Sequence, residues 1–176
     1  MFDKEYRFKG SHAFKVEQLK NVFDSTSGAK LFDSSIAVYT VAPLIGFLYG
    51  EKKEEDNEKN LVNDQLYSEH IFIGELNRYK LELEYNFRLI MLLDEEYEPD
   101  KENRINKAFR HPGEDPNDIK LFDSYARGGI DVLYAKLINE SVSPDDYVDN
   151  LFDFLLDFDD KFNKSLSTDE ILSLCN

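Results

Sequence analysis

Side chains suited to catalysis or metal binding are few in this sequence, and their spacing excludes the common sites. The three histidines form no HExxH motif, and none follows a Glu by three residues as the ligands of di-iron bundles do: His12, His70 and His111. The single cysteine, Cys175, excludes a cysteine-rich zinc site and an intramolecular disulfide. The patterns GxxxxGK(S/T), GxGxxG and GxSxG are absent. We therefore expect no catalytic residue, no metal and no cofactor.

The segment RINKAFRH, from Arg104 to His111, is the strongest candidate for an enzyme. An Arg followed after six residues by His resembles the Rx4–6H motif of HEPN ribonucleases, which are small all-α domains that act as dimers. The resemblance implies an RNA-cleaving centre made of Arg104 and His111. The sequence departs from the family at Ile105, where a polar residue is usual, and has Pro112 after the His. We prefer a surface helix that ends in a His-Pro-Gly turn and keep the ribonuclease as an alternative.

The pentapeptide KLFDS occurs twice, at 30–34 and 120–124. A carboxylate pair made of Asp33 and Asp123 would suit acid–base chemistry, but no His or third acid keeps the same spacing. The two segments diverge beyond the repeat, so we interpret both as starts of amphipathic helices. In the second segment Gly128 and Gly129 fall within a helical pattern, which favours close helix packing over phosphate binding.

The most organised charged feature is an acidic stretch near the C-terminus. From Glu140 to Asp160 there are eight acids and no Lys or Arg. At about 100° per residue, five aspartates fall within an arc of about 80°: Asp146, Asp149, Asp153, Asp157 and Asp160. Like charges at i,i+4 cost a few tenths of a kcal/mol each, and no lysine is interleaved to offset them. We take these five as candidate partner-binding residues, against the alternative of a solvated helix face. The opposite side, expected to face the core, carries Val148, Leu151, Phe152, Leu155 and Phe162.

Composition limits the partners. With 36 acidic and 21 basic residues the formal charge is −15, and this field repels nucleic acid and anionic membrane surfaces. We therefore expect no direct nucleic-acid binding and a larger protein partner with a basic surface. A decoy that occupies a nucleic-acid-binding cleft fits the same charge. The longest uncharged run, Ser34 to Gly50, is too short for a bilayer, and MFDKEYRFKG lacks the apolar stretch of a signal peptide, so we expect no membrane and a cytoplasmic location.

Hydrophobic periodicity predicts one all-α domain over residues 1–176, an irregular bundle of six to seven helices without a convincing strand. The expected helices cover about 11–23, 29–49, 63–95, 100–110, 115–139 and 144–163, with a last short one after a capping box at Ser167. Caps are also expected at Asp115 and Ser143, each followed by a proline. The acidic segment at about 51–60 has no apolar residue and is expected to be a mobile loop.

Three apolar stretches, DSSIAVYTVAPLIGFLYGEK, FRLIMLLDE and GGIDVLYAKL, resemble small uncharacterised bacterial proteins associated with phage-defence or restriction operons. The resemblance implies an accessory subunit of such a system. Our first hypothesis is therefore a non-catalytic accessory or regulatory subunit of a larger complex, which docks through its acidic C-terminal half. The alternatives are the HEPN-like ribonuclease and a nucleic-acid-mimicking inhibitor, and a homo-oligomer stays open.

Overall fold

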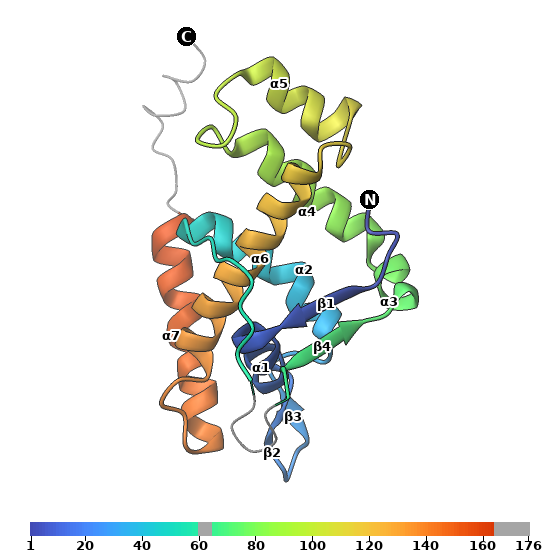
Figure 1. The fold of residues 1–176 in the computed structure, drawn as a ribbon. Coiled ribbons are helices and arrows are strands. Elements are labelled where there is room, and N and C mark those ends of the chain that lie inside the picture. The colour runs from blue at the N-terminus through green and yellow to red at the C-terminus, as the bar shows by residue number, and fades with distance from the viewer. Residues whose placement is uncertain (60–64, 164–176) are drawn as a thin grey trace.

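The computed structural model describes residues 1–59 and 65–163 (Figure 1). Its helices are α1 (Gly10–Leu19), α2 (Ser35–Tyr49), α3 (Ile73–Arg78), α4 (Lys80–Leu93), α5 (Lys101–Ile105), the π-helical turn η1 (Asn106–Arg110), α6 (Pro116–Leu137) and α7 (Pro144–Phe162). Its strands are β1 (Tyr6–Lys9), β2 (Val22–Asp24), β3 (Ala29–Lys30) and β4 (Ser68–Ile71). The prediction of a mostly helical fold is confirmed in this part of the chain.

The prediction that strands are absent is wrong. β1 pairs antiparallel with β4, and β2 pairs antiparallel with β3, so the described residues form two small sheets of two strands each. In β1 the side chain of Phe8 is buried, and Tyr6 stacks on Tyr39 with ring centroids 4.3 Å apart. This alternation extends over only four residues, which is too short for a periodicity signal.

The strands also shorten three predicted helices. α1 ends at Leu19, and Phe23 lies in β2 instead of continuing the helix. α2 begins only at Ser35, because residues that were expected in this helix form β3 instead. A turn precedes β3, and in it Gly28 has a φ of +74°. The helix expected over 63–95 is divided into β4, α3 and α4.

Helix starts with a cap and a proline are where the sequence predicts them. At α6 the Asp115 side chain accepts a hydrogen bond of 2.9 Å from the amide of Asn117. At α7, Ser143 and Asp146 form a reciprocal capping box, in which the Ser143 amide donates to Asp146 over 2.7 Å. The capping box expected at Ser167 and the helix after it lie outside the described residues.

The core is built around the crossing of α2 and α6, which glycines bring together. A Cβ atom on Gly129 would lie 1.8 Å from the Ala42 carbonyl oxygen, and one on Gly46 would lie 2.0 Å from the Tyr125 carbonyl oxygen. Gly128 approaches the Glu51 carbonyl in the same way. The prediction of close helix packing is confirmed for Gly129, whereas Gly128 packs against the segment that follows α2.

The acidic segment expected as a mobile loop is described up to residue 59 and is bound to the body at several points. The Lys53 amide donates to the Ser124 carbonyl over 3.0 Å, and the Arg127 guanidinium donates to the Lys53 carbonyl over 2.8 Å. Lys9 of β1 forms an ion pair of 2.8 Å with Glu55. These contacts hold the segment against α6 and the first sheet.

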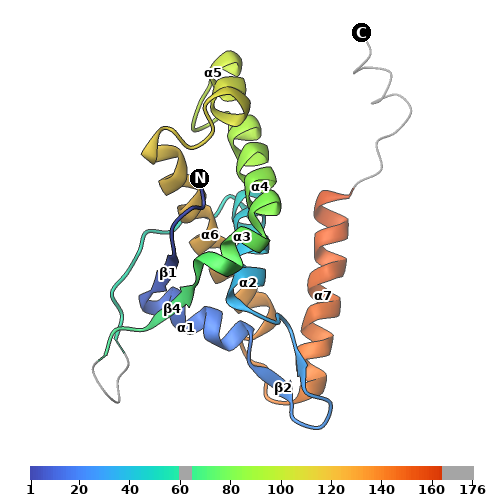
Figure 2. The same ribbon diagram turned by 90° about the vertical axis from the view of Figure 1, so that its right-hand side faces the viewer.

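α7 stands at the edge of the molecule. Figure 1 shows it beside α6, and Figure 2 shows it separated from α4, with its N-terminal end near β2. The body therefore covers only part of its circumference. No helix of the described residues combines the length and apolar content that a membrane crossing requires.

Candidate functional site

α7 packs on the body through a narrow line of aromatic side chains. Phe154 is buried, and Tyr147 and Phe158 are half-buried. Tyr147 stacks on Phe23 of β2 with centroids 5.0 Å apart, and Phe158 contacts Phe162 at 4.8 Å. Near the C-terminal end of the helix Phe162 meets Tyr49 of α2 at 5.4 Å. The side of α7 that faces the body is therefore the one that carries these four aromatic residues.

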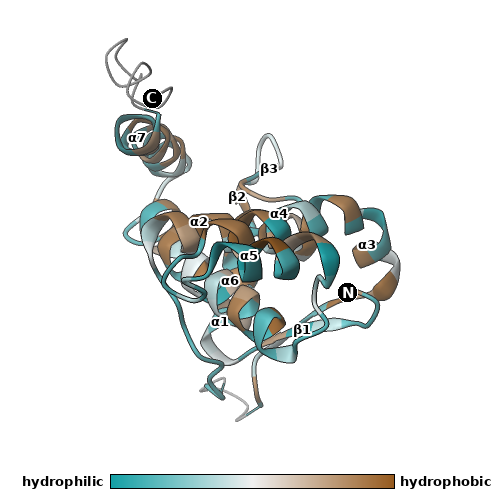
Figure 3. Cartoon of the chain, turned by 90° about the horizontal axis from the view of Figure 1, so that it is seen from above, coloured by the Kyte–Doolittle hydropathy of each residue, from teal (hydrophilic) through white to brown (hydrophobic). Residues whose placement is uncertain are grey.

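The apolar side chains that the sequence places in the core are instead on the surface. Val148, Leu151, Phe152 and Leu155 are between 38% and 61% exposed, so the expectation that they face the core is wrong. Phe162 alone of that set packs against the body. The physical reason is the orientation of α7 about its own axis. The aromatic residues that contact the body lie at one edge of the apolar side of α7, so the rest of that side is left uncovered. Figure 3 shows α7 standing apart with apolar residues along it.

The five candidate aspartates divide into two groups. Asp149, Asp153, Asp157 and Asp160 are exposed, whereas Asp146 is half-buried and belongs to the cap of α7. Hydrogen bonds from the backbone amides of Ser143 and Val142 lower the pKa of the Asp146 carboxyl. Asp146 therefore has a structural role that the helical arc alone does not reveal.

Asp157 is also paired. The Lys136 ammonium of α6 lies 2.8 Å from Asp157 Oδ2, and this hydrogen bond raises the pKa of Lys136. The compensating lysine that sequence reasoning did not find comes from the preceding helix, 21 residues away. Within the described chain the side chains of Asp149, Asp153 and Asp160 carry no hydrogen bond or ion pair, so these three form the free part of the acidic face.

Next to α7 lies an apolar groove of about 610 Å³. Its walls are α2, α4 and the Phe158 side of α7, and most of its surface is aliphatic or aromatic. On the α4 side Leu81 is 79% exposed and Tyr85 is 65% exposed. Sequence reasoning missed this groove, although Leu81 and Tyr85 are one helical turn apart, on a side of α4 away from the buried Leu83 and Phe87.

The structure gives Arg104 and His111 separate partners. The Arg104 guanidinium is buried and donates to the carbonyls of Glu98 and Pro99, both over 3.0 Å, and to Glu95 over 2.8 Å. His111 is exposed and lies 3.2 Å from Glu114. Arg104 thus fixes the turn between α4 and α5. The ribonuclease stays a prediction that this geometry does not favour.

Asp33 and Asp123 are not brought together. Asp33 is exposed near β3, whereas Asp123 of α6 accepts a hydrogen bond of 2.8 Å from the Tyr39 hydroxyl. Asp123 also lines a cavity of about 380 Å³ with Tyr6 and Tyr39. Burial, only partly offset by the Tyr39 hydrogen bond, raises the pKa of Asp123 to about 6. The aspartate of the first pentapeptide is therefore exposed, whereas that of the second is hydrogen-bonded inside the fold.

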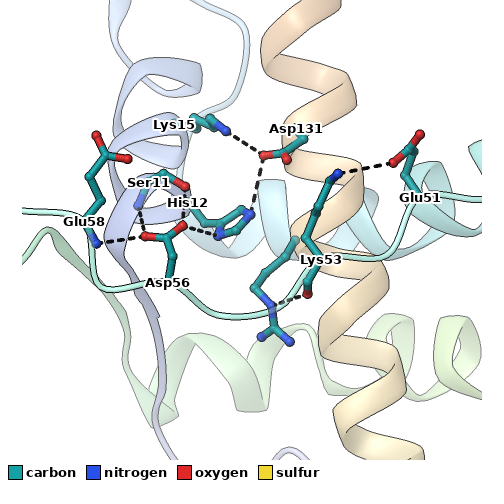
Figure 4. A network of polar contacts seen from close by, with 9 residues as sticks. Ser11, His12, Lys15, Glu51, Lys53, Asp56, Glu58 and Asp131 are labelled. Carbon is teal, nitrogen blue, oxygen red and sulfur yellow. Dashed lines mark hydrogen bonds and ion pairs between the residues drawn. The ribbon is translucent and has the colours of Figure 1, made fainter.

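A polar network joins α1, α6 and the acidic segment (Figure 4). The His12 ring is buried, with Nδ1 3.5 Å from Asp56 and Nε2 3.4 Å from Asp131. Asp131 pairs with Lys15 over 2.7 Å, and Asp56 accepts hydrogen bonds from Ser11. Burial lowers the pKa of His12. Among residues 1–59 and 65–163, no cluster of three or more His, Cys, Asp or Glu is arranged to hold a metal ion, and the network serves to hold the acidic segment in place.

No family model matches the chain, and neither the curated proteins nor the solved structures contain a match. The resemblance to phage-defence proteins therefore stays a prediction.

Proposed function

We propose that this chain is a non-catalytic interaction protein that binds a larger protein partner with a basic surface through α7. In this role it is an accessory or regulatory subunit of a cytoplasmic complex, for which an anti-phage defence system is one candidate. The observation that carries the proposal is the exposure of both the acidic face and the apolar face of α7.

The energetics of α7 support a binding role. A contiguous exposed apolar surface is costly in water and typically marks an interaction site. Burying one large aliphatic or aromatic side chain contributes about 1.5–3 kcal/mol. Five such side chains on α7 are therefore available to a partner: Val148, Leu151, Phe152, Leu155 and Leu156.

The charge of the chain supports a basic partner. The free carboxylates of Asp149, Asp153 and Asp160 lie on the same helix as the exposed apolar side chains, and the whole chain carries −15. A complementary basic surface accelerates association and excludes acidic competitors. A nucleic-acid mimic would also present carboxylates, but the apolar surface of α7 favours a protein surface over a phosphate-binding cleft.

The proposal is tested by removing charge from α7. The variant Asp149→Asn, Asp153→Asn, Asp160→Asn removes three free carboxylates and leaves the Asp146 cap and the Asp157–Lys136 pair intact. With the partner purified from the source organism, we expect this variant to bind about tenfold more weakly at low salt and with a flatter salt dependence.

A matched control removes the same charge elsewhere. The variant Asp3→Asn, Glu17→Gln, Glu54→Gln changes three exposed acids away from α7 and should bind like the wild type. If both variants bound the partner equally weakly, the loss of affinity would reflect the net charge of the chain and not the position of the carboxylates on α7. Unchanged affinity of the α7 variant across salt concentrations, or no co-purifying partner at physiological salt, would contradict the proposal.

A further inference from the structure

We propose that the apolar groove between α2, α4 and α7 binds an amphipathic helix of the partner, with its apolar face in the groove and Lys or Arg on its outer face. This inference rests on the proposed function, because it names the class of segment that the partner presents. Helix-in-groove recognition needs an apolar channel lined by ridges at helical spacing and a rim that selects the charge of the ligand.

The groove supplies these ridges from three helices. α2 contributes Val41, Leu44 and Leu48, which follow one another at three and four residues. α4 contributes Leu81 and Tyr85, which are four residues apart. Rows of this kind interdigitate with the i, i+3, i+4, i+7 side chains of a further helix. The groove is therefore shaped for a helix more than for an extended strand, which needs a free sheet edge.

α7 extends the groove beyond its lined volume. Phe158 lines the groove directly, and Leu151 and Leu155 lie seven and three residues before it, on the same side of the helix. From Leu151 to Phe158 this wall rises about 10 Å along the helix axis, at roughly 1.5 Å per residue. A ligand helix can therefore contact α7 along about two turns.

The charges around the groove favour a partner helix that carries Lys or Arg on its outer face. Glu82 lines the groove on the α4 side, and Asp159 is exposed on α7, one helical turn after Leu155. The nearby cations of α4, Lys80 and Arg88, both pair with Glu84, at 3.9 Å and 3.4 Å. Lys161 of α7 lies over the Tyr49 ring, 4.1 Å from its centroid, and adds a cation near this end of the groove. The negative field that favours a helix with exposed Lys or Arg over an acidic one is therefore that of the whole chain, which carries −15.

The same charges disfavour a second copy of this chain as the occupant. Each copy carries −15, and self-association through this face would place two acidic copies of α7 close together. Like charges in an interface cost several kcal/mol and suppress pairing. A basic helix from another protein meets no such penalty.

The test uses three synthetic peptides of about 18 residues, roughly five helical turns, with the purified full chain. The first has Leu on one helical face and Lys on the other, the second has the same composition in scrambled order, and the third has Glu in place of Lys. Fluorescence anisotropy at physiological salt measures the affinities. We expect the first peptide to bind at least about tenfold more tightly than either of the others.

The site is tested with variants of exposed groove residues that should not disturb folding. The variant Leu81→Ser, Tyr85→Ser should weaken binding of the first peptide about tenfold, since both side chains are exposed in the free chain. The control Phe109→Ser, Val142→Ser alters one aromatic and one aliphatic side chain that are exposed elsewhere, and should leave the affinity unchanged.

The outcomes separate this inference from the proposed function. Equal binding of the first and second peptides, or unaltered binding by the groove variant, would overturn the inference. Docking of the partner on α7 is decided separately, by the affinity of the Asp149, Asp153 and Asp160 variant for the purified partner, so the groove inference can fail while the proposed function stands. A concentration-dependent dimer in sedimentation experiments that the groove variant abolishes would overturn the inference in favour of a second copy.

Discussion

Replacement of Gly129 by alanine is expected to lower the free energy of unfolding by at least about 3 kcal/mol, because it creates steric overlap at the centre of the fold. The new methyl group would lie 1.8 Å from the Ala42 carbonyl oxygen and 2.8 Å from the Gly46 amide nitrogen. Both neighbours are helical backbone, which cannot rotate away as a side chain can. α2 and α6 would have to separate, and separation opens the buried cluster around Tyr39 and Phe122.

The matched control is Gly74→Ala. Gly74 lies in α3, and a Cβ there meets nothing within 4 Å. In a helix, alanine is favoured over glycine by about 1 kcal/mol, so this variant should be neutral or more stable. Urea denaturation of both variants measures the difference. A Gly129→Ala protein as stable as Gly74→Ala would show that the two helices do not cross at this distance.

The variant Asp123→Asn is expected to be more stable than the wild type above neutral pH, by at most about 3 kcal/mol. Burial raises the pKa of the folded-state carboxyl from 3.8 to about 6, so the folded protein holds this proton more tightly than the unfolded chain. The wild type therefore loses stability as pH rises from about 4 to about 6. Asparagine carries no charge at any pH and can still accept the hydrogen bond from Tyr39.

The stability difference between variant and wild type, measured by urea unfolding from pH 3 to pH 8, should therefore be small at the acid end and grow through this window. Taking the difference cancels the opposite contribution of His12, whose lowered pKa makes the protein less stable in acid. Asp33→Asn is the control, because this residue of the other KLFDS copy is exposed. A pH-independent difference for Asp123→Asn would contradict a buried carboxyl with a raised pKa.

Local signals in the sequence predicted the local features of the structure. The caps at Asp115 and Ser143 are confirmed because a side chain and the first amides of a helix are only two or three residues apart. The role of Gly129 also followed from its place in a helical pattern. The two small sheets did not, since β1 pairs with β4 across about 60 residues and each strand is at most four residues long.

The candidate site was predictable in composition but not in orientation. The helical arc shows which aspartates share a face, yet the pairing of Asp157 depends on Lys136 of another helix. The apolar side of α7 was expected in the core because amphipathic helices usually bury it. Its exposure depends on the edge position of α7, which only the packing of Phe154 and Phe158 against the body defines.

The central claim, that the apolar side of α7 is uncovered in the free chain and buried by the partner, is tested most directly at Phe152. The chain contains no tryptophan, so Phe152→Trp introduces a single indole, and fluorotryptophan labelling of this chain alone gives one fluorine NMR signal. We predict a solvent-exposed signal in the free chain, accessible to a soluble quencher, and a shifted, protected signal when the purified partner is added. A protected indole in the free chain, or one that stays exposed in the complex, would contradict the claim.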